Sequence, residues 1–138
     1  MKLDNVIRYA SDLLDLLVDS GPLTSGEVCE KLDWPRGRFD TALRHARDQM
    51  CPPLGLTIPA PTPSDGWLYQ VTTEWEPVEA GAAYTLGHVD ARLSRILRDV
   101  DTILPHLTPR TREWNRARFL SKHLSHLIGT LSEIDSRG

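Results

Sequence analysis

The sequence predicts a mainly α-helical fold with a small β-hairpin, which places the protein in the α+β class. Two observations lead to this prediction. Apolar residues recur every three or four positions in the first third of the chain and again in the last third, as they do in amphipathic helices. Between these regions lie two short runs of β-forming residues, separated by a proline-rich segment. The 138 residues suffice for one ordinary domain, or for one small domain with an appendage.

The first two helices are expected over residues 3–19 and about 24–32. Ser20-Gly21-Pro22 ends the first helix, because glycine adopts the left-handed cap conformation and proline cannot continue the hydrogen-bond ladder. Thr24 and Glu27 match a capping box, in which a hydroxyl and a carboxylate accept hydrogen bonds from the free amide groups of a helix start. The second helix is therefore expected to begin at this point.

A third helix is predicted over residues 35–50. Asp33-Trp34-Pro35 interrupts the second helix, and Pro35 suits the first position of a new helix because its missing N–H is not needed there. The β-hairpin is expected next, with strands at residues 54–58 and 67–72. Three prolines lie in the connection between these strands, since proline cannot donate to a strand ladder.

The second half of the chain predicts an antiparallel helical hairpin with coiled-coil character. Large apolar residues follow alternating spacings of three and four, first from Leu86 to Leu107 and then from Ala117 to Ile134. Pro105 is expected to end the first helix, and Thr108-Pro109 to begin the second. Further apolar residues widen the stripe beyond a two-helix contact, which predicts docking against a second copy as a four-helix assembly. These additional residues are Leu97, Leu104, Phe119 and Ile128.

Net positive charge is confined to two segments, although the whole chain carries a formal net charge of −3. The net charge is −4 over residues 1–33, +2 over residues 34–53, −4 over residues 54–87 and +3 over residues 88–138. A nucleic-acid-binding surface requires a local concentration of positive charge rather than a positive total. The distribution therefore keeps a DNA partner open.

The start and the outer side of the predicted third helix carry the candidate DNA-binding residues. The major groove admits one α-helix, whose N-terminal residues reach base edges. Arginine pairs bidentately with guanine, and threonine can bond to a base or contact a thymine methyl group. For any single arginine, a solvated surface is the plainer interpretation. With Phe39 and Leu43 turned inward, the candidates are Arg36, Arg38, Thr41, Arg44, His45 and Arg47.

The chain resembles the winged helix-turn-helix family of DNA-binding regulators over residues 3–73. The resemblance lies in Leu23-Thr24-Ser25-Gly26-Glu27-Val28 and in the stretch from Leu32 through Trp34-Pro35-Arg36-Gly37-Arg38 to Leu43. It implies a winged helix-turn-helix DNA-binding domain over residues 1–75. The helical hairpin at residues 76–138 is similar to the dimerisation helices that many such regulators append. One departure is that residues 54–73 contain no lysine or arginine, which the wings of the family usually supply to the minor groove.

Other classes of site find little support in the sequence. No glycine-rich phosphate loop or nucleophile elbow occurs, so neither an enzyme nor a cofactor is expected. His123 and His126 lack a neighbouring carboxylate or cysteine in sequence, so a metal site is not expected either. Cys29 and Cys51 are expected to be free thiols that serve packing. No apolar run is long enough for a membrane helix and no export signal is present, which predicts a cytoplasmic protein.

These observations predict a homodimeric transcriptional regulator that binds double-stranded DNA with residues 35–50 in the major groove and pairs through residues 80–136. Two alternatives stay open, since a fold alone does not define a function. One is a winged-helix protein-interaction adaptor, and the other is an accessory protein for partition, replication or recombination of a phage or plasmid. The basic cluster from Arg110 to Lys122 would meet acids within the helical hairpin, DNA phosphates or a further protein partner.

Overall fold

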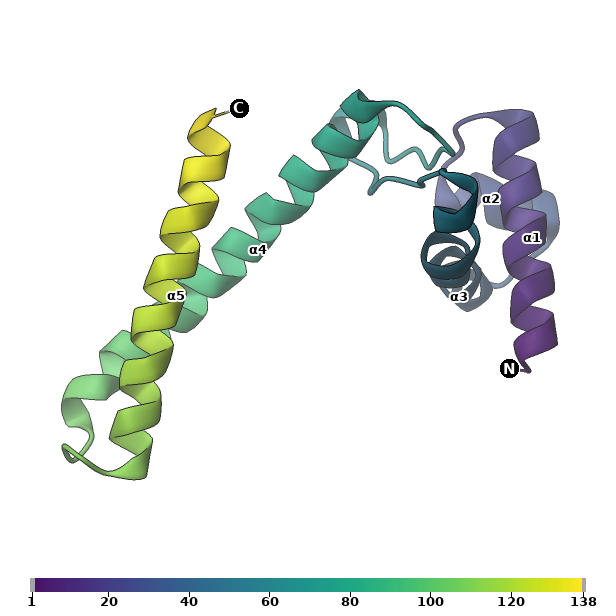
Figure 1. Ribbon diagram of the computed structural model, residues 1–138. Helices are drawn as coiled ribbons and strands as arrows, with labels where there is room; N and C mark the ends of the chain where they lie inside the picture. Colours follow the sequence, from purple (N-terminus) through teal and green to yellow (C-terminus); the bar gives the residue numbers. More distant parts are fainter. Residues whose placement is uncertain (1, 138) are drawn as a thin grey trace. The chain divides into compact units, whose positions relative to one another are not determined.

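The computed structural model describes residues 2–137, with side chains as far as Ile134, and helices account for most of this part of the chain (Figure 1). The chain divides into two compact units, an N-terminal unit that ends at Ala82 and a C-terminal unit that begins at Ala83. The division falls within a continuous helix. The α-helices are α1 (Leu3–Ser20), α2 (Ser25–Leu32), α3 (Arg36–His45), α4 (Trp75–Ile103) and α5 (Arg112–Arg137).

The first two helices form as the sequence predicts. Gly21 follows α1 with a φ of 76°, and its N–H donates to the carbonyl oxygen of Leu17. The capping box at the start of α2 is confirmed, because Thr24 Oγ1 accepts from the N–H of Glu27 and Glu27 Oε1 accepts from the N–H of Thr24. Asp33 ends α2 in the left-handed conformation, with a φ of 54°.

The third helix changes its winding near its end. α3 continues without a break into a π-helical turn, η1 (Ala46–Met50), where the N–H of Cys51 donates to the carbonyl oxygen of Ala46 at 2.8 Å. The predicted helix over residues 35–50 is therefore present, but its last turn is wider than an α-helical turn. Residues 33–35 form a short turn between α2 and α3.

The core of the N-terminal unit lies where α1, α2 and α3 pack together. Leu13 of α1, Val28 of α2 and Phe39 of α3 are at most 1% exposed. The ring of Phe39 meets the edge of Tyr69 at a centroid distance of 5.1 Å, which joins α3 to the segment after residue 66. Each of the first three helices thus buries one apolar side and leaves the other to solvent.

The predicted β-hairpin is wrong, and with it the α+β winged helix-turn-helix fold. Among residues 2–137 no strand forms, and β pairing is limited to two isolated antiparallel bridges, Leu23 with Tyr69 and Thr57 with Thr72. Residues Pro52–Leu54 form a 3-10 turn, η2, and Pro63–Asp65 form a second one, η3. The observed fold is therefore mainly helical, with an irregular segment between α3 and α4.

Prolines and one arginine explain why no ladder extends from these bridges. Pro59, Pro61 and Pro63 have no N–H to donate to a neighbouring strand. The carbonyl oxygens of Ile58 and Pro59 accept hydrogen bonds from the guanidinium of Arg47 at 2.8 and 3.1 Å, where a strand would accept from a backbone N–H. Both the donors and the acceptors of a regular hairpin are thus missing or engaged elsewhere.

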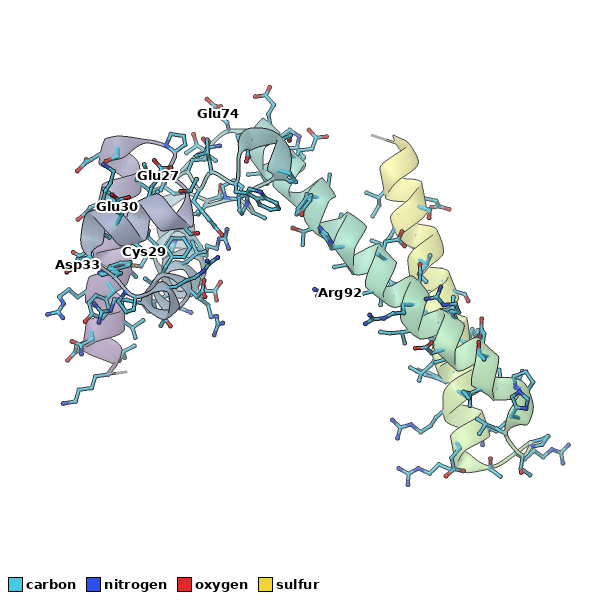
Figure 2. The ribbon with its side chains drawn as sticks, turned by 180° about the vertical axis from the view of Figure 1, so that it is seen from behind. Glu27, Cys29, Glu30, Asp33, Glu74 and Arg92 are labelled. Atoms are coloured by element: carbon cyan, nitrogen blue, oxygen red, sulfur yellow. The ribbon has the colours of Figure 1, made fainter. Side chains whose placement is uncertain are left out.

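The C-terminal unit consists of the rest of α4, a 3-10 turn at Leu104–His106 (η4), and α5. α4 and α5 run side by side in opposite directions (Figures 1 and 2), and Ser121 Oγ donates to Asp101 Oδ1 at 2.6 Å between them. α4 begins earlier than the sequence suggested, because the polar residues after Trp75 are already helical. α5 begins later than Thr108-Pro109, with Thr111 Oγ1 accepting from the N–H of Trp114.

Candidate nucleic-acid interface

The exposed side of α3 brings together three of the predicted DNA-binding residues. Thr41, Arg44 and His45 line one shallow surface groove of about 260 Å³, together with Asp48 and Gln49 of η1 and Val6 of α1. The opposite side of α3 is packed into the core through Phe39, Ala42 and Leu43. The groove is therefore presented by a helix whose orientation is held by its buried residues.

The polar groups in this groove can both donate and accept hydrogen bonds. Arg44 is exposed, whereas Thr41 and His45 are half-buried. Thr41 Oγ1 donates to the carbonyl oxygen of Gly37 at 3.2 Å, which leaves the oxygen available as an acceptor. Gln49 offers an amide that can pair with adenine, in the way that arginine pairs with guanine. Gln49 follows His45 by four residues, about one helical turn, and was not among the residues predicted from the sequence.

Arg36 lies in a second cleft, at the start of α3. This cleft has a volume of about 430 Å³ and also contains Thr24 and Ser25 at the N-terminus of α2. Pro61, Gly66, Trp67 and Tyr69 complete its lining. The guanidinium of Arg36, the hydroxyl of Ser25 and the indole ring of Trp67 make a suitable surrounding for a phosphate group and the sugar or base attached to it.

Trp67 is a functional candidate that was not among the residues predicted from the sequence. Its side chain is 48% exposed, and its backbone has a φ of 62°, a conformation that is uncommon for a bulky residue. Asp65 Oδ1 accepts from the N–H groups of Thr62 and Leu68, and this small loop keeps Trp67 at the surface. Asp65-Gly66 indicates a turn in the sequence, but not that the next indole is exposed.

Arg38 is only half-exposed and joins α3 to α1. Its guanidinium lies 4.3 Å from the ring centroid of Tyr9, and the guanidinium of Arg8 lies 5.1 Å from the same ring. Trp34 meets the edge of Tyr9 at 5.7 Å. Arg38 Nε is buried without a hydrogen-bond partner. The side chain therefore contributes cation–π contacts within the fold, as well as positive charge near the start of α3.

Arg47 points into the protein, unlike the other candidates. It is half-buried, its guanidinium donates to the carbonyl oxygens of Ile58 and Pro59, and it lies 5.6 Å from the ring centroid of Tyr69. Burial lowers the pKa of Arg47 below its ordinary value. In this position it fixes the irregular segment against η1, and it also lines an open surface pocket together with Gly55 and Thr57.

Two other groups of predicted residues have clear places in the structure. Cys51 is buried in the core and Cys29 packs at its edge, both as free thiols, and burial raises the pKa of Cys51. In the C-terminal unit, the ring of His123 lies against the ring of Phe119 in a tilted arrangement, with a centroid distance of 4.0 Å. Among the described residues, no three histidine, cysteine or acidic side chains are grouped to hold a metal ion. No helix in the described part combines the length and apolar character needed to cross a membrane.

Comparison of the chain with protein-family models, with curated proteins and with solved structures found no match. The candidate functional features are the groove formed by Thr41, Arg44 and His45, and the cleft that contains Arg36.

Proposed function

We propose that the N-terminal unit binds double-stranded DNA in a sequence-specific manner through the exposed side of α3, as part of a homodimeric transcriptional regulator that acts in the cytoplasm. The observation that carries this proposal is the groove in which Thr41, Arg44 and His45 lie together on a helix anchored by its opposite side. Arginine and threonine at this spacing lie about one helical turn apart, so they can contact neighbouring base pairs.

The order of elements supports a major-groove arrangement for α3. α2, a three-residue turn and α3 follow one another, and in helix-turn-helix proteins the second helix enters the groove while the first crosses the backbone. A Cβ atom at Gly37 would meet no atom within 4 Å, so the backbone at the start of α3 is open to a ligand. The cleft at Arg36 would then receive a phosphate beside the contacted bases.

Acidic residues limit where and how strongly DNA can bind. Glu27, Glu30 and Asp33 give α2 an exposed acidic side (Figure 2), which excludes that side from phosphate contact. Asp40 and Asp48 are exposed on α3 and η1, close in sequence to the candidate residues. We therefore expect few phosphate contacts, weak binding to random duplexes, and specificity that depends mainly on base contacts.

Enrichment of a random duplex library on the purified full-length protein tests this proposal. Arg44→Ala should lower the affinity for the enriched sequence by roughly 10- to 100-fold, because one bidentate base contact is lost. Arg36→Ala should weaken enriched and random duplexes about equally, and should reduce the slope of log K against log salt by about one unit.

Arg95→Ala is the matched control, since it removes an exposed arginine from the C-terminal unit. It should leave the affinity for the enriched sequence unchanged. If no sequence is enriched, or if Arg44→Ala and Arg95→Ala behave alike, α3 is not a DNA-reading helix. A protein-interaction adaptor would then be the better proposal. A partition, replication or recombination protein would use the same surface on DNA.

A further inference from the structure

The C-terminal unit carries a large apolar face that no described residue of this unit covers. Six aliphatic residues, three on α4 and three on α5, have side chains that are between 38% and 54% exposed. Exposed apolar patches of this kind mark surfaces that contact a partner. We refer to these residues as the open face: Val89, Ile96, Ile103, Leu120, Leu127 and Ile134.

The open face follows from a mismatch between the apolar repeat and the contact between the two helices. Half-buried residues mark the contact line. From Asp90 onward they are Asp90, Leu93, Leu97 and Val100 on α4, followed by Leu104 of η4. The apolar repeat of the sequence shares Leu93 and Val100 with this line. Three further members of the repeat, Val89, Ile96 and Ile103, lie one position before the contact line and stay exposed. The pairing of α4 with α5 therefore uses only part of the repeat.

Both halves of the open face lie on the same side of the helical pair. In an antiparallel pair of helices, the residue that precedes each contact residue lies on one side of the contact line, and this side is the same for both helices. The residue that follows each contact residue lies on the opposite side. The residues on that other side are small or polar: Gly87, Ser94, Asp101, Arg118, Ser125 and Ser132. The unit thus has one apolar side and one polar side, as each half of a four-helix bundle does.

We infer that a second copy of this chain covers the open face, with α4 antiparallel to α4 of the second copy and α5 antiparallel to its α5. The spacing of the residues supports this arrangement. Val89 and Ile103 lie seven residues before and after Ile96, so a two-fold axis at Ile96 places Val89 against Ile103 of the second copy. Likewise, an axis at Leu127 places Leu120 against Ile134 of the second copy.

The hydrogen bond between α4 and α5 shows that the axis at Ile96 and the axis at Leu127 can be one and the same axis. Ser121 and Asp101 are joined at 2.6 Å and therefore lie at the same height along the pair. Five residues back from Asp101 is Ile96, and five residues forward from Ser121 is His126, the neighbour of Leu127. Ile96 and Leu127 consequently lie within about one residue of the same level, which is a rise of roughly 1.5 Å.

The same two-fold axis also brings opposite charges together beside the open face. Arg92 lies four residues before Ile96 and Asp99 lies three residues after it, and both are exposed. Arg92 extends from α4 on the side away from α5 (Figure 2). The axis at Ile96 brings Arg92 close to Asp99 of the second copy, and Asp99 close to its Arg92. Two reciprocal ion pairs at the edge of an apolar contact are typical of helices that select an antiparallel partner.

The pairing described here would be the homodimer of the proposed regulator, and its biological purpose rests on that proposed function. The residues that support the pairing all lie between residues 83 and 134. Two copies related by a two-fold axis would present two copies of α3, which suits an inverted repeat in the DNA. Association is therefore measured without DNA. If the two copies do not pair, the effect of Arg44→Ala on DNA affinity still tests the proposed function independently.

Charge exchange tests the pairing on full-length protein by sedimentation equilibrium. The unaltered protein should be a dimer. Arg92→Asp alone and Asp99→Arg alone should each weaken the dimer roughly tenfold, because two attractive pairs become repulsive. An equal mixture of the two single variants should form a heterodimer with the original affinity, since opposite charges then meet at both positions. Arg92→Asp combined with Asp99→Arg in one chain should also restore the original affinity.

Two further variants separate the open face from general effects on folding. Ile96→Ser with Leu127→Ser should abolish association, whereas Arg95→Asp, the same charge reversal outside the open face, should leave it unchanged. Helix content is followed by circular dichroism. If the double serine variant unfolds, recovery in the mixture of charge variants still decides the question. A monomeric unaltered protein, or a dimer that is indifferent to both charge reversals, would overturn the inference.

Discussion

The two units of the molecule differ in how completely they bury their apolar residues. In the N-terminal unit, Leu13 and Val28 are fully buried, and Phe39 is 1% exposed. In the C-terminal unit, none of the described side chains from Ala83 to Ile134 reaches the same class of burial. Three helices around a common centre can enclose a core, whereas two helices enclose only a line of contacts. An apolar repeat therefore has different consequences in the two units.

This difference suggests that the N-terminal unit is stable by its own packing, and that the C-terminal unit depends on a partner. The stability of a unit that needs a partner varies with protein concentration, because association shifts the folding equilibrium by mass action. Stability that comes from packing within one chain does not vary in this way. Three substitution experiments use this distinction or test the contacts behind it.

The largest effect is expected from a matched pair of leucine substitutions. Leu13→Ala should cost about 2–5 kcal/mol of unfolding free energy in the N-terminal unit, because a fully buried side chain leaves a cavity. Leu127→Ala, at a leucine that is 45% exposed, should cost less, and its cost should depend on protein concentration. Urea unfolding at two protein concentrations measures both. A concentration-independent loss for Leu127→Ala would remove the contrast between the units.

Smaller changes in stability, of opposite sign, are expected from alanine substitutions at two glycines of α4. A Cβ atom at Gly81 would lie 2.7 Å from the carbonyl oxygen of Ala60, whereas one at Gly87 would meet nothing within 4 Å. Gly81→Ala should therefore destabilise the N-terminal unit by about 1–3 kcal/mol, because the backbone at Ala60 must shift. Gly87→Ala should stabilise α4 by up to about 1 kcal/mol. Thermal unfolding of each variant checks these signs, and equal signs would argue against the close packing at Gly81.

The smallest effect is expected from pH and concerns only the N-terminal unit. The hydrogen bonds from Thr24 lower the pKa of Glu27 below its ordinary value of 4.5. Because the folded pKa is depressed, the charged carboxylate stabilises the fold above pH 4.5, and this contribution is lost as the pH falls through the lowered value. Glu27→Gln should remove this part of the acid dependence. Urea midpoints of both proteins, from neutral pH to below 4.5, should converge as the pH falls. A constant difference would contradict the prediction.

The capped helices could be read from local sequence, whereas the irregular segment could not. Thr24 and Glu27 satisfy each other within one helical turn, so their pattern is sufficient to predict the start of α2. The two β-forming runs indicated a hairpin, but Arg47, eleven residues before Ile58, takes up the carbonyl oxygens that a strand would need. Residue preferences do not reveal such competition between a side chain and a backbone partner.

The candidate site was found only in part for a similar reason. The sequence places four arginines within twelve residues, and nothing in their spacing distinguishes them. The structure exposes Arg36 and Arg44, sets Arg38 against Tyr9 and turns Arg47 inward. Which arginine is available to a ligand depends on neighbours that are distant along the chain.

The sequence alone was enough to predict that five helical segments form and which of their residues are apolar, because helical period and capping are local properties of the chain. Only the tertiary structure decided which apolar residues meet a neighbour. On α4, Leu93 and Ile96 belong to the same repeat, yet the first is half-buried and the second is exposed. The reason is geometric: a repeat defines one side of a helix, and burial depends on how many other helices are present to cover that side.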